Sequence, residues 1–393
     1  MNSVAVIAEA ARTPFGRFCG KLRHFSAVDL GALAASAVMT RAGVQPGDID
    51  ETLFGTAILA ASTSVAARQI NFKVGIPAST PSLTLDRACC SSMTALGLAL
   101  AKIRAGDASI VIAGGIESCS QMPFLLKGTR SGRKLGDFTV EDPMQVRNPI
   151  TGLALTLVTG RKALEHGVSR EEQDEWACAS HQRYFAAFDR GVYAGEILAI
   201  DVPREGELKM DESPRRDTSL EKLRSLPTAY GSPTVTAGNA PGLNDGGSAL
   251  LVMSSEEARR RGVRPLVEVV AYAQASGDLE SSVYMPGHAM LKALKKADIA
   301  LEELKRIEIN EAFAAMPLVS TQVAAGGDAA KTARLRAITN VNGGAVAIGH
   351  PPGASGARIV MALARELRRL GGGYGAASIC GGYGQSDAVI LKV

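Results

Sequence analysis

Short apolar runs alternate with longer segments of helical periodicity along most of the chain. Strand-like runs at residues 4–8, 52–54 and 109–113 are separated by helical patterns, such as residues 29–42, which end at Gly43. A second series follows downstream, with strand-like runs at 267–271, 306–309 and 376–379 and helical patterns at 287–297 and 353–370. Such alternation is typical of α/β folds. It predicts two similar α/β halves with a parallel-rich sheet in each.

The segment 88–104 is apolar on nearly all sides. A helix of that composition is expected inside a core rather than on its surface, and Gly106 is a natural end for it. The strand at 109–113 then meets two glycines, which predict a tight turn at Gly114 and Gly115. We therefore expect an interior helix followed directly by a core strand.

The composition changes between residues 119 and 232, which are more polar and richer in Pro, Arg and Lys than the flanking segments. We interpret this stretch as an inserted loop domain that contains helices such as residues 170–190. Strand character resumes at 234–236 and 249–253. The predicted units are an N-terminal core half (1–118 with 233–265), the loop domain (119–232) and a C-terminal core half (266–393).

Charge and hydropathy exclude some classes of function. The balance of Lys+Arg 43 against Asp+Glu 39 leaves +4, too mild and too evenly spread to favour nucleic acid or a membrane surface as a partner. It is compatible with an anionic small substrate. No apolar run reaches membrane-spanning length, and residues 1–10 have the pattern of a first strand rather than a signal peptide. We therefore expect a cytoplasmic protein.

The cysteines do not form a metal or disulfide pattern. Their spacing includes no C-x-x-C pair and no histidine pairing of the zinc type, so we expect reduced thiols and no metal site. The six are Cys19, Cys89, Cys90, Cys119, Cys178 and Cys380.

Cys89 stands at the start of the predicted interior helix. The free N–H groups and the dipole of a helix N-terminus favour an anion, so this position predicts a thiol shifted toward thiolate. The alternatives are that Cys89 and Cys90 are small buried hydrophobic residues, or that they form a vicinal disulfide. Cys90 would point about 100° further round the helix, so the two cannot share one role.

Three residues from the second half could complete a site around that thiol. His350 lies in a glycine-rich loop before a helix, where an imidazole can accept a thiol proton, although a lone histidine is often structural. Cys380 ends a strand and is followed by glycines whose N–H groups could hold an oxyanion; alternatively it is a buried residue before a turn. Asn310 could fix a water or simply cap the next helix.

Over nearly its full length the chain resembles the thiolase family. The similar segments, in order, are VAVIAEAARTPFG (4–16), DRACCSS (86–92), AGGIESCSQMP (113–123), TVTAGNAPGLNDG (234–246), NEAF (310–313), GGAVAIGHP (343–351) and CGGYG (380–384). Several motifs in the same order make chance similarity very improbable.

The resemblance implies a layered α-β-α-β-α fold and a role for each site residue. Cys89 would be the nucleophile that becomes acylated, His350 its base, and a water held by Asn310 the second donor to the thioester oxygen. Cys380 would move the proton next to the second carbonyl, and the backbone N–H groups of Cys89 and Gly382 would bind the tetrahedral oxyanion.

The same resemblance implies substrates, partners and assembly. Ala240, Gly242 and Phe313 would contact the substrate. Acyl-CoA and coenzyme A would be the ligands, with no separate cofactor, and the protein would be a homo-oligomer, either a dimer or a tetramer. The segment GRKLGDF (132–138) resembles the one that forms thiolase tetramers.

Several positions depart from the usual thiolase pattern. Asp86, Ser92, Tyr383 and Ser386 replace Asn or Gly, Pro241 replaces a serine, and the histidine expected near residues 154–160 is absent. The segment 281–286 (SSVYMP) lacks the usual Gly-x-Gly-Pro. We therefore expect reversible Claisen condensation and thiolytic cleavage through an acyl-cysteine, with an atypical acyl preference.

Two rival functions remain at this stage. A ketoacyl-synthase-like condensing enzyme would pair its cysteine with two histidines, or with a histidine and an asparagine, whereas Cys380 here takes the place of the second base. Of the other histidines, which are His24, His166, His181 and His288, only His288 could serve as a substitute. The other rival is a non-catalytic acyl-CoA-binding protein that retains the fold.

Overall fold

The computed structural model describes residues 4–59, 64–132, 134–145, 148 and 150–393. Residues 1–3 of the expected first strand, and Arg133 of the expected tetramer segment, lie outside the described residues.

The strands in chain order are β1 (Ala5–Arg12), β2 (Gly16–Arg17), β3 (Glu51–Gly55), β4 (Ser82–Leu85), β5 (Ile110–Ser118), β6 (Leu125–Leu126), β7 (Val140–Glu141), β8 (Ile200–Val202), β9 (Gly206–Leu208), β10 (Asn244–Ser254), β11 (Val267–Ser276), β12 (Leu304–Ile309), β13 (Tyr374–Cys380) and β14 (Gln385–Lys392). The α-helices are α1 (Ala27–Ala42), α3 (Ala66–Val74), α4 (Ser91–Ala105), α5 (Leu155–Glu165), α6 (Arg170–Asp189), α7 (Leu220–Arg224), α8 (Ser255–Arg260), α9 (Met285–Ala297), α10 (Ala315–Ala324), α11 (Ala329–Ala337), α12 (Ala345–Ile348) and α13 (Pro352–Arg369). Short 3₁₀ helices are η1 (Lys21–His24), η2 (Pro46–Asp48), η3 (Cys119–Gln121), η4 (Ser281–Val283) and η5 (Leu301–Glu303).

The main sheet has an internal two-fold repeat of topology. Its order is β12-β13-β14-β11-β1-β10-β5-β3-β4, and β11 meets β1 at the centre through a short antiparallel contact. Moving outward from that contact, both sides give an antiparallel pair, a second antiparallel pair and then a parallel pair. The expectation of two similar halves is therefore confirmed by topology, although the sequence contains no visible repeat.

Two local expectations are wrong. The halves are not parallel-rich, because the strands nearest the centre are antiparallel and the parallel pairs lie toward the outer edges. No turn forms at Gly114 and Gly115, because β5 continues through both. A Cβ on Gly115 would lie 1.9 Å from the Gly353 carbonyl oxygen, so glycine is needed there for a close approach of α13 rather than for a turn.

A third expectation also fails. Residues 234–236 form no strand and make only an isolated bridge between Thr228 and Thr236. The hydrophobic alternation there reflects one buried valine, Val235, in an otherwise polar loop.

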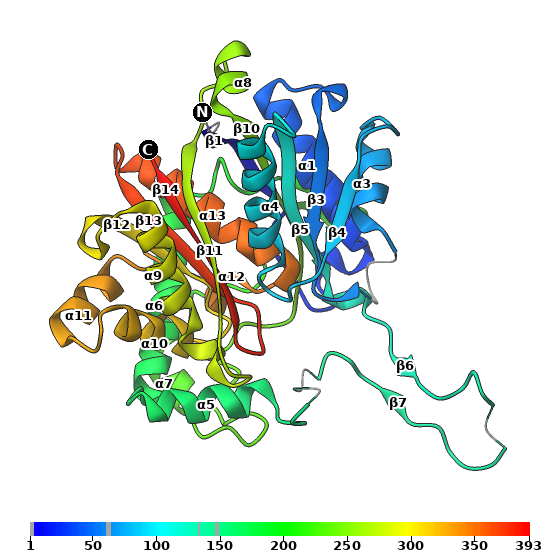
Figure 1. The fold of residues 1–393 in the computed structure, drawn as a ribbon. Helices are drawn as coiled ribbons and strands as arrows, with labels where there is room; N and C mark the ends of the chain where they lie inside the picture. The colour runs from blue at the N-terminus through cyan, green and yellow to red at the C-terminus, as the bar shows by residue number, and fades with distance from the viewer. Residues whose placement is uncertain (1–3, 60–63, 133, 146–147, 149) are drawn as a thin grey trace.

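Three large apolar cores hold helices against the two halves of the sheet, and Figure 1 shows how these helices and strands are arranged. One core lies between α1, α3 and the N-terminal half of the sheet, and another lies between α9 and the C-terminal half. The central core contains α4 and α13, which pack against each other between the two halves. The prediction of an interior helix is confirmed: α4 buries most of its length and ends at Gly106, whose φ is 81°.

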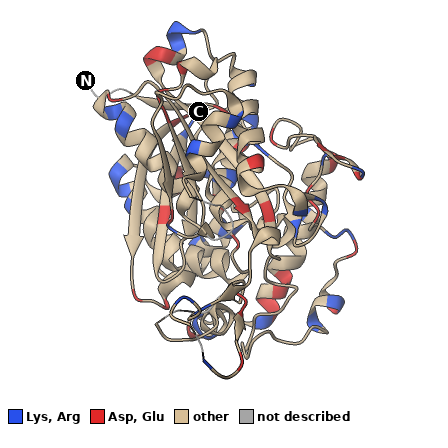
Figure 2. Cartoon of the chain, turned by 90° about the vertical axis from the view of Figure 1, so that its right-hand side faces the viewer, with Lys and Arg blue, Asp and Glu red and all other residues tan. Residues whose placement is uncertain are grey.

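Residues between β5 and β10 cover one end of this body. α5, α6 and α7 lie there, and the β6–β7 hairpin projects far from the rest of the molecule (Figure 1). Positive and negative residues are intermingled over the face that Figure 2 shows. Among the described residues, no helix combines the length and the apolar character needed to cross a bilayer.

Candidate active site

Cys89 lies at the tip of a strained turn that leads into α4. Ala88, the residue before it, has φ 48°, a left-handed conformation that costs a non-glycine residue roughly 1 kcal/mol. The side chain of Asp86 accepts the Ala88 N–H at 2.7 Å. The Ser91 hydroxyl accepts the Arg87 N–H at 2.8 Å and donates to the Ala88 carbonyl at 2.6 Å. The helix begins at Ser91 rather than at residue 88, so Cys89 stands just outside its first turn.

His350 is held by the loop that precedes α13. Its backbone N–H donates to the Asn244 side chain at 2.9 Å, and His350 forms a bridge with Leu243. Gly349, with φ 106°, lies so close to Asn244 that a Cβ would approach the amide carbon to 2.6 Å. This packing explains one glycine of the glycine-rich loop.

The Cys89 thiol and the His350 imidazole form a dyad. Sγ lies 3.2 Å from Nε2, while Nδ1 lies 2.7 Å from the Ser355 hydroxyl. That hydroxyl has one hydrogen and donates it to the Pro351 carbonyl at 2.8 Å, so Nδ1 must carry the imidazole proton. Nε2 is therefore left as an acceptor facing the thiol. Nothing in the sequence marked Ser355 for this role.

The resting dyad is neutral, which corrects the expectation of a thiolate. Burial raises the pKa of Cys89 well above its usual value, with further increases from Cys380 and Glu117. Burial lowers the pKa of His350 to about 3, and the charge of Arg358 adds to that effect. Desolvation of the charged form outweighs the attraction of the helix N-terminus.

Cys380 ends β13 and is almost fully buried, with 3% exposed. Burial raises the pKa of Cys380 to about 11, and the backbone N–H of Gly382 opposes that rise. The loops that carry the two cysteines are in contact, because a Cβ on Gly381 would lie 2.9 Å from the Cys90 sulfur. The charge interaction with Cys380 is also the second-largest cause of the raised pKa of Cys89. Cys90 instead points into the central core, and its thiol donates to the Ile379 carbonyl at 3.3 Å.

Asn310 follows β12 and has a fully buried side chain. Neither its Oδ1 nor its Nδ2 has a hydrogen-bond partner among the described residues. It does not cap the next helix, α10, which begins at Ala315 and shows no side-chain cap bond. An orphan buried amide is costly unless a water or ligand completes it, so this position calls for a bound polar group.

Glu311, next to Asn310, organises the loop that carries His350. Its carboxylate accepts from Trp176 and Asn340 on one oxygen, and from Ser180 and the Val346 N–H on the other. All four partners lie far from Glu311 in the sequence. Trp176 and Ser180 lie on α6, so the carboxylate ties α6 to the start of α12.

The expected substrate residues share one loop and its neighbour. Ala240 and Gly242 lie between Asn239, whose carbonyl accepts the Ala314 N–H at 2.9 Å, and Leu243, which bridges to His350. Phe313 precedes Ala314 and packs in the same cluster as Cys380. The loop that contains Ala240 and Gly242 therefore meets His350 through Leu243, and Phe313 lies in the apolar cluster that contains Cys380.

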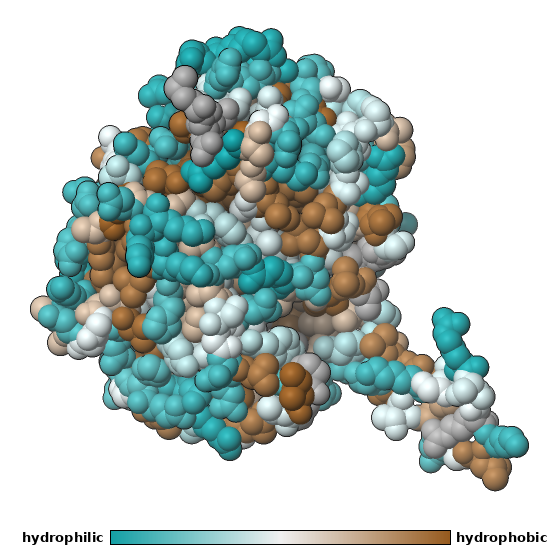
Figure 3. Space-filling view, in the orientation of Figure 1, coloured by the Kyte–Doolittle hydropathy of each residue, from teal (hydrophilic) through white to brown (hydrophobic). Residues whose placement is uncertain are grey.

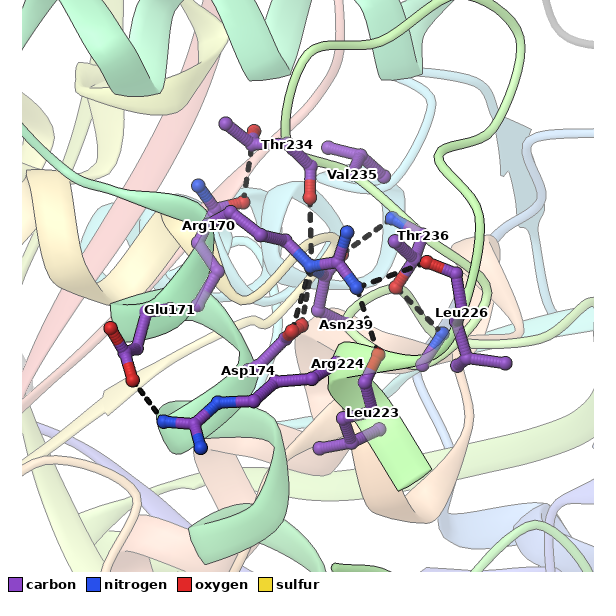
Figure 4. Close-up of polar contacts among 12 residues, drawn as sticks. Arg170, Glu171, Asp174, Leu223, Arg224, Leu226, Thr234, Val235, Thr236 and Asn239 are labelled. Carbon is purple, nitrogen blue, oxygen red and sulfur yellow. Dashed lines mark hydrogen bonds and ion pairs between the residues drawn. The ribbon is translucent and has the colours of Figure 1, made fainter. Parts of the chain in front are cut away.

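The start of this loop is fixed by α6, as Figure 4 shows. The Asn239 amide donates to Asp174 at 2.9 Å and to the Thr234 carbonyl at 3.0 Å. Arg170 pairs with the same Asp174 at 2.7 Å and also donates to the Leu223 carbonyl. The position of the substrate loop is therefore set by residues that lie far upstream.

No other histidine that the structure describes forms a hydrogen bond or ring contact with Cys89 or His350. His288 is exposed on α9 and contacts Tyr284 edge-on, with ring centroids 5.8 Å apart. His166, the residue that follows α5, contacts the same ring, and His181 accepts the Arg215 N–H. His24 ends η1.

The two segments that depart from the usual thiolase pattern, 154–160 and 281–286, pack against each other. α5, which contains most of the unusual segment 154–160, packs against η4 at the start of the unusual segment 281–286. Val283 and Tyr284 from the second segment belong to the same apolar cluster as Cys380 and Phe313. These departures therefore line a common region next to the second thiol.

Residues 5–256 match the sequence family described as thiolase, N-terminal domain, and residues 263–393 match thiolase, C-terminal domain. The chain is 38% identical to a probable acetyl-CoA acetyltransferase of Mycobacterium leprae, covering 99% of both chains. It is also 38% identical to the mitochondrial 3-ketoacyl-CoA thiolase of Homo sapiens, covering all of this chain and 98% of the relative.

The fold is similar to solved structures of the same kind. A crystal structure of human mitochondrial 3-ketoacyl-CoA thiolase in complex with CoA matches with a TM-score of 0.93 and 37% identity, covering 99% of this chain and 98% of that one. The acetyl-CoA acetyltransferase of Bacillus anthracis matches with a TM-score of 0.94 and 35% identity, covering 100% and 99%.

Proposed function

The chain belongs to the thiolase family, and we propose that it is an acyltransferase that joins two acyl-CoA molecules, or cleaves a 3-oxoacyl-CoA, through an acyl-Cys89 intermediate. The observation that carries this proposal is the Cys89–His350 dyad, with Sγ and Nε2 3.2 Å apart. Covalent capture on sulfur divides the reaction into two thioester exchanges, which predicts ping-pong kinetics.

In the first step His350 accepts the thiol proton at Nε2 while Sγ attacks the carbonyl carbon. Both groups are neutral at rest, so the ion pair forms only as the tetrahedral oxyanion develops. Collapse of that intermediate expels the leaving group and leaves the acyl group on sulfur. When the leaving group is coenzyme A thiolate, His350 returns the proton to it.

In cleavage the leaving group is instead a carbanion next to a thioester carbonyl, and Cys380 protonates it. The pKa of Cys380, about 11, keeps this thiol protonated at neutral pH, as an acid requires. The resulting Cys380 thiolate then takes a proton from incoming coenzyme A, whose sulfur attacks acyl-Cys89. The bond between the acyl group and Cys89 breaks, and His350 returns its proton to the released Cys89 thiolate. Condensation runs the same steps in reverse, and metabolite levels decide the direction.

Asn310 is proposed to hold a water that donates to the thioester oxygen together with His350. Its buried and unpartnered amide supports this role. The N–H groups of Cys89 and Gly382 are proposed to bind the oxyanion of the tetrahedral step. The steps use side chains, backbone and the thiol of coenzyme A alone, so we propose that the reaction needs no further cofactor.

The substrate is proposed to be a 3-oxoacyl-CoA with an acyl group other than acetoacetyl. The contiguous atypical wall formed by α5 and η4, beside Cys380 and Phe313, supports an altered acyl pocket. A panel of 3-oxoacyl-CoA substrates of graded length and branching, assayed in cleavage with free coenzyme A, tests this. A clear preference for acetoacetyl-CoA contradicts it.

A homo-oligomer, dimer or tetramer, is proposed for the assembly. The β6–β7 arm exposes large apolar side chains on its described residues, among them Phe124 at 69% and Leu135 at 90%, and Figure 3 shows brown patches along the arm. Light scattering of the intact protein and of the double variant Phe124→Ser/Leu135→Ser would distinguish a dimer from a tetramer. A tetramer that is unchanged in the variant argues against a role of the arm in assembly.

The cytoplasm is proposed as the compartment, because a reactive thiol needs a reducing environment. All six cysteines are free in the structure. Cell fractionation with antibody detection tests this proposal, and recovery in an oxidising compartment contradicts it.

A direct experiment distinguishes the proposed enzyme from a non-catalytic acyl-CoA-binding protein. Mass spectrometry after incubation with acetyl-CoA should find an acyl adduct on the Cys89 peptide, absent in Cys89→Ala. Binding of coenzyme A without any adduct on Cys89 would instead support the non-catalytic alternative.

A further inference from the structure

Arg87 forms a side-chain bridge between the loop of the nucleophile and the strand beside the second thiol. Its Nη1 lies 3.0 Å from Asp387 Oδ1, and its Nε donates to the Gln385 side chain at 3.4 Å. Gln385 and Asp387 flank Ser386, which pairs with Cys380 across β14 and β13. One side chain thus contacts the two neighbours of the residue that opposes Cys380.

The far end of this bridge is rigid and buried. Asp387 is fully buried, and its Oδ2 accepts from Thr94 on α4 at 2.5 Å and from Tyr272 on β11 at 2.6 Å. Tyr272 reaches this place because α4 carries Gly97, where a Cβ would lie 2.4 Å from the ring. A carboxylate fixed by three elements is a firm anchor for a guanidinium.

The Arg87 side chain extends from the strained turn that precedes Cys89. Arg87 is the residue before Ala88, whose left-handed φ of 48° precedes Cys89. A strained residue keeps its conformation only when its surroundings determine it on both sides. Ser91 holds the turn from the helix side through the Arg87 N–H and the Ala88 carbonyl, and the Arg87 side chain holds it from the opposite half of the sheet.

The turn also packs directly on the loop of the second thiol. A Cβ on Gly381 would lie 2.9 Å from both the Arg87 carbonyl oxygen and the Cys90 sulfur. A side chain at position 381 would clash with the turn, so the two loops are in close contact. A movement of either loop would therefore change the separation of the two thiols.

We propose that Arg87, anchored by Asp387, is a positioning residue that sets the distance between the sulfurs of Cys89 and Cys380. This rests on the roles proposed above for the two cysteines. The acylation half-reaction uses Cys89 and His350, while cleavage also needs Cys380 within reach of the substrate. Loss of the bridge should therefore impair cleavage much more than acylation.

The experiment compares Arg87→Gln and the double variant Arg87→Gln/Asp387→Asn, which leaves no buried charge. Arg306→Gln is the matched control, because Arg306 is about as exposed as Arg87 (25% against 20%) and pairs with Glu366 at the same 3.0 Å. The readouts are exchange of label between acetyl-CoA and free coenzyme A, cleavage of a 3-oxoacyl-CoA, and the rate at which a short bifunctional thiol reagent links Cys89 to Cys380.

Both bridge variants should keep exchange within about threefold and lose cleavage by about tenfold to a hundredfold, as expected for a small misplacement of a reacting group. The cross-linking rate should fall by a similar factor, and Arg306→Gln should change none of the three. Equal loss of exchange and cleavage, or unchanged cross-linking, overturns the proposal. Cross-linking does not depend on catalytic roles; full cleavage by Cys380→Ser would instead refute the proposed function.

Discussion

Cys89 and His350 occupy equivalent places in the two halves of the fold. α4 begins at Ser91 and α13 at Pro352, so each functional residue stands two residues before an interior helix, and these two helices pack on one another. The repeat of topology therefore places the ends of two distant segments face to face. Sγ and Nε2 meet at 3.2 Å as a result.

The neutral dyad predicts how Cys89 responds to pH. Because burial raises the pKa of Cys89 and only the thiolate is nucleophilic, alkylation by iodoacetamide in the free enzyme should keep accelerating above pH 9. Peptide mass spectrometry measures it, with the exposed Cys19 as the internal reference. A rate that is already constant near pH 7 would mean a preformed thiolate.

Ser355 is predicted to orient the imidazole. Ser355→Ala removes the acceptor of the Nδ1 proton, so exchange between acetyl-CoA and labelled coenzyme A should slow by roughly five- to tenfold, the equivalent of one hydrogen bond. Ser248→Ala is the control, because its hydroxyl donates to the neighbouring Ala354 carbonyl at 2.7 Å with no contact to His350. Equal effects of the two substitutions would assign Ser355 a structural role only.

Cys380→Ser should separate the half-reactions. A serine hydroxyl is a far weaker acid than a thiol, so cleavage of 3-oxoacyl-CoA should fall by about 10²–10⁴-fold, while acylation of Cys89 persists. Stopped-time mass spectrometry follows the adduct and a thioester absorbance assay follows cleavage. If acylation and cleavage both continued at wild-type rates, Cys380 would have no role in the mechanism.

Glu117 is predicted to make folding stability fall as pH rises. Burial raises the pKa of Glu117 to about 7 from 4.5, although its carboxylate accepts from Thr56, Ala57, Ile58 and Gly353. Between these values the unfolded chain has released the proton that the folded chain retains, so this stabilising term is complete below pH 4.5 and disappears through pH 7. Its size is roughly 3 kcal/mol.

Urea unfolding of the wild type and of Glu117→Gln at several pH values measures this term. The difference in unfolding free energy between the two proteins should change across pH 4.5–7, with the wild type losing stability relative to the variant. Taking the difference removes contributions from other groups, including His350, whose lowered pKa acts in the opposite direction over an overlapping range. A constant difference contradicts the prediction.

Gly115→Ala should disrupt the contact of β5 with α13. Its Cβ would lie 1.9 Å from the Gly353 carbonyl oxygen, and overpacking of this kind typically costs about 1–3 kcal/mol or more. Because Gly353 lies near His350, activity should fall as well. Gly47→Ala is the control, since a Cβ there meets nothing within 4 Å. Thermal unfolding checks both, and a Gly115→Ala melting temperature equal to that of Gly47→Ala would refute the clash.

Much of the site could be predicted from sequence, because its chemistry is concentrated in short motifs. Cys89, His350, Cys380 and Asn310 were singled out, and the structure places Cys89 against His350, with Cys380 near enough to raise the pKa of the Cys89 thiol. Ser355 and the raised pKa of Glu117 were not identified, because the effect of a buried serine or glutamate depends on partners and burial that only the fold supplies. Arg87 escaped for the same reason: its anchor lies at residue 387.

Local sequence determined where strands and helices lie and how several of them end, because apolar periodicity and capping glycines act over a few residues. α1 and α4 end at Gly43 and Gly106 for that reason. Tertiary structure alone decided strand direction, the continuation of β5 through Gly114 and Gly115, and the protonation of the dyad. Each of these depends on packing between distant segments, and burial rather than the nearby helix end sets the pKa of Cys89.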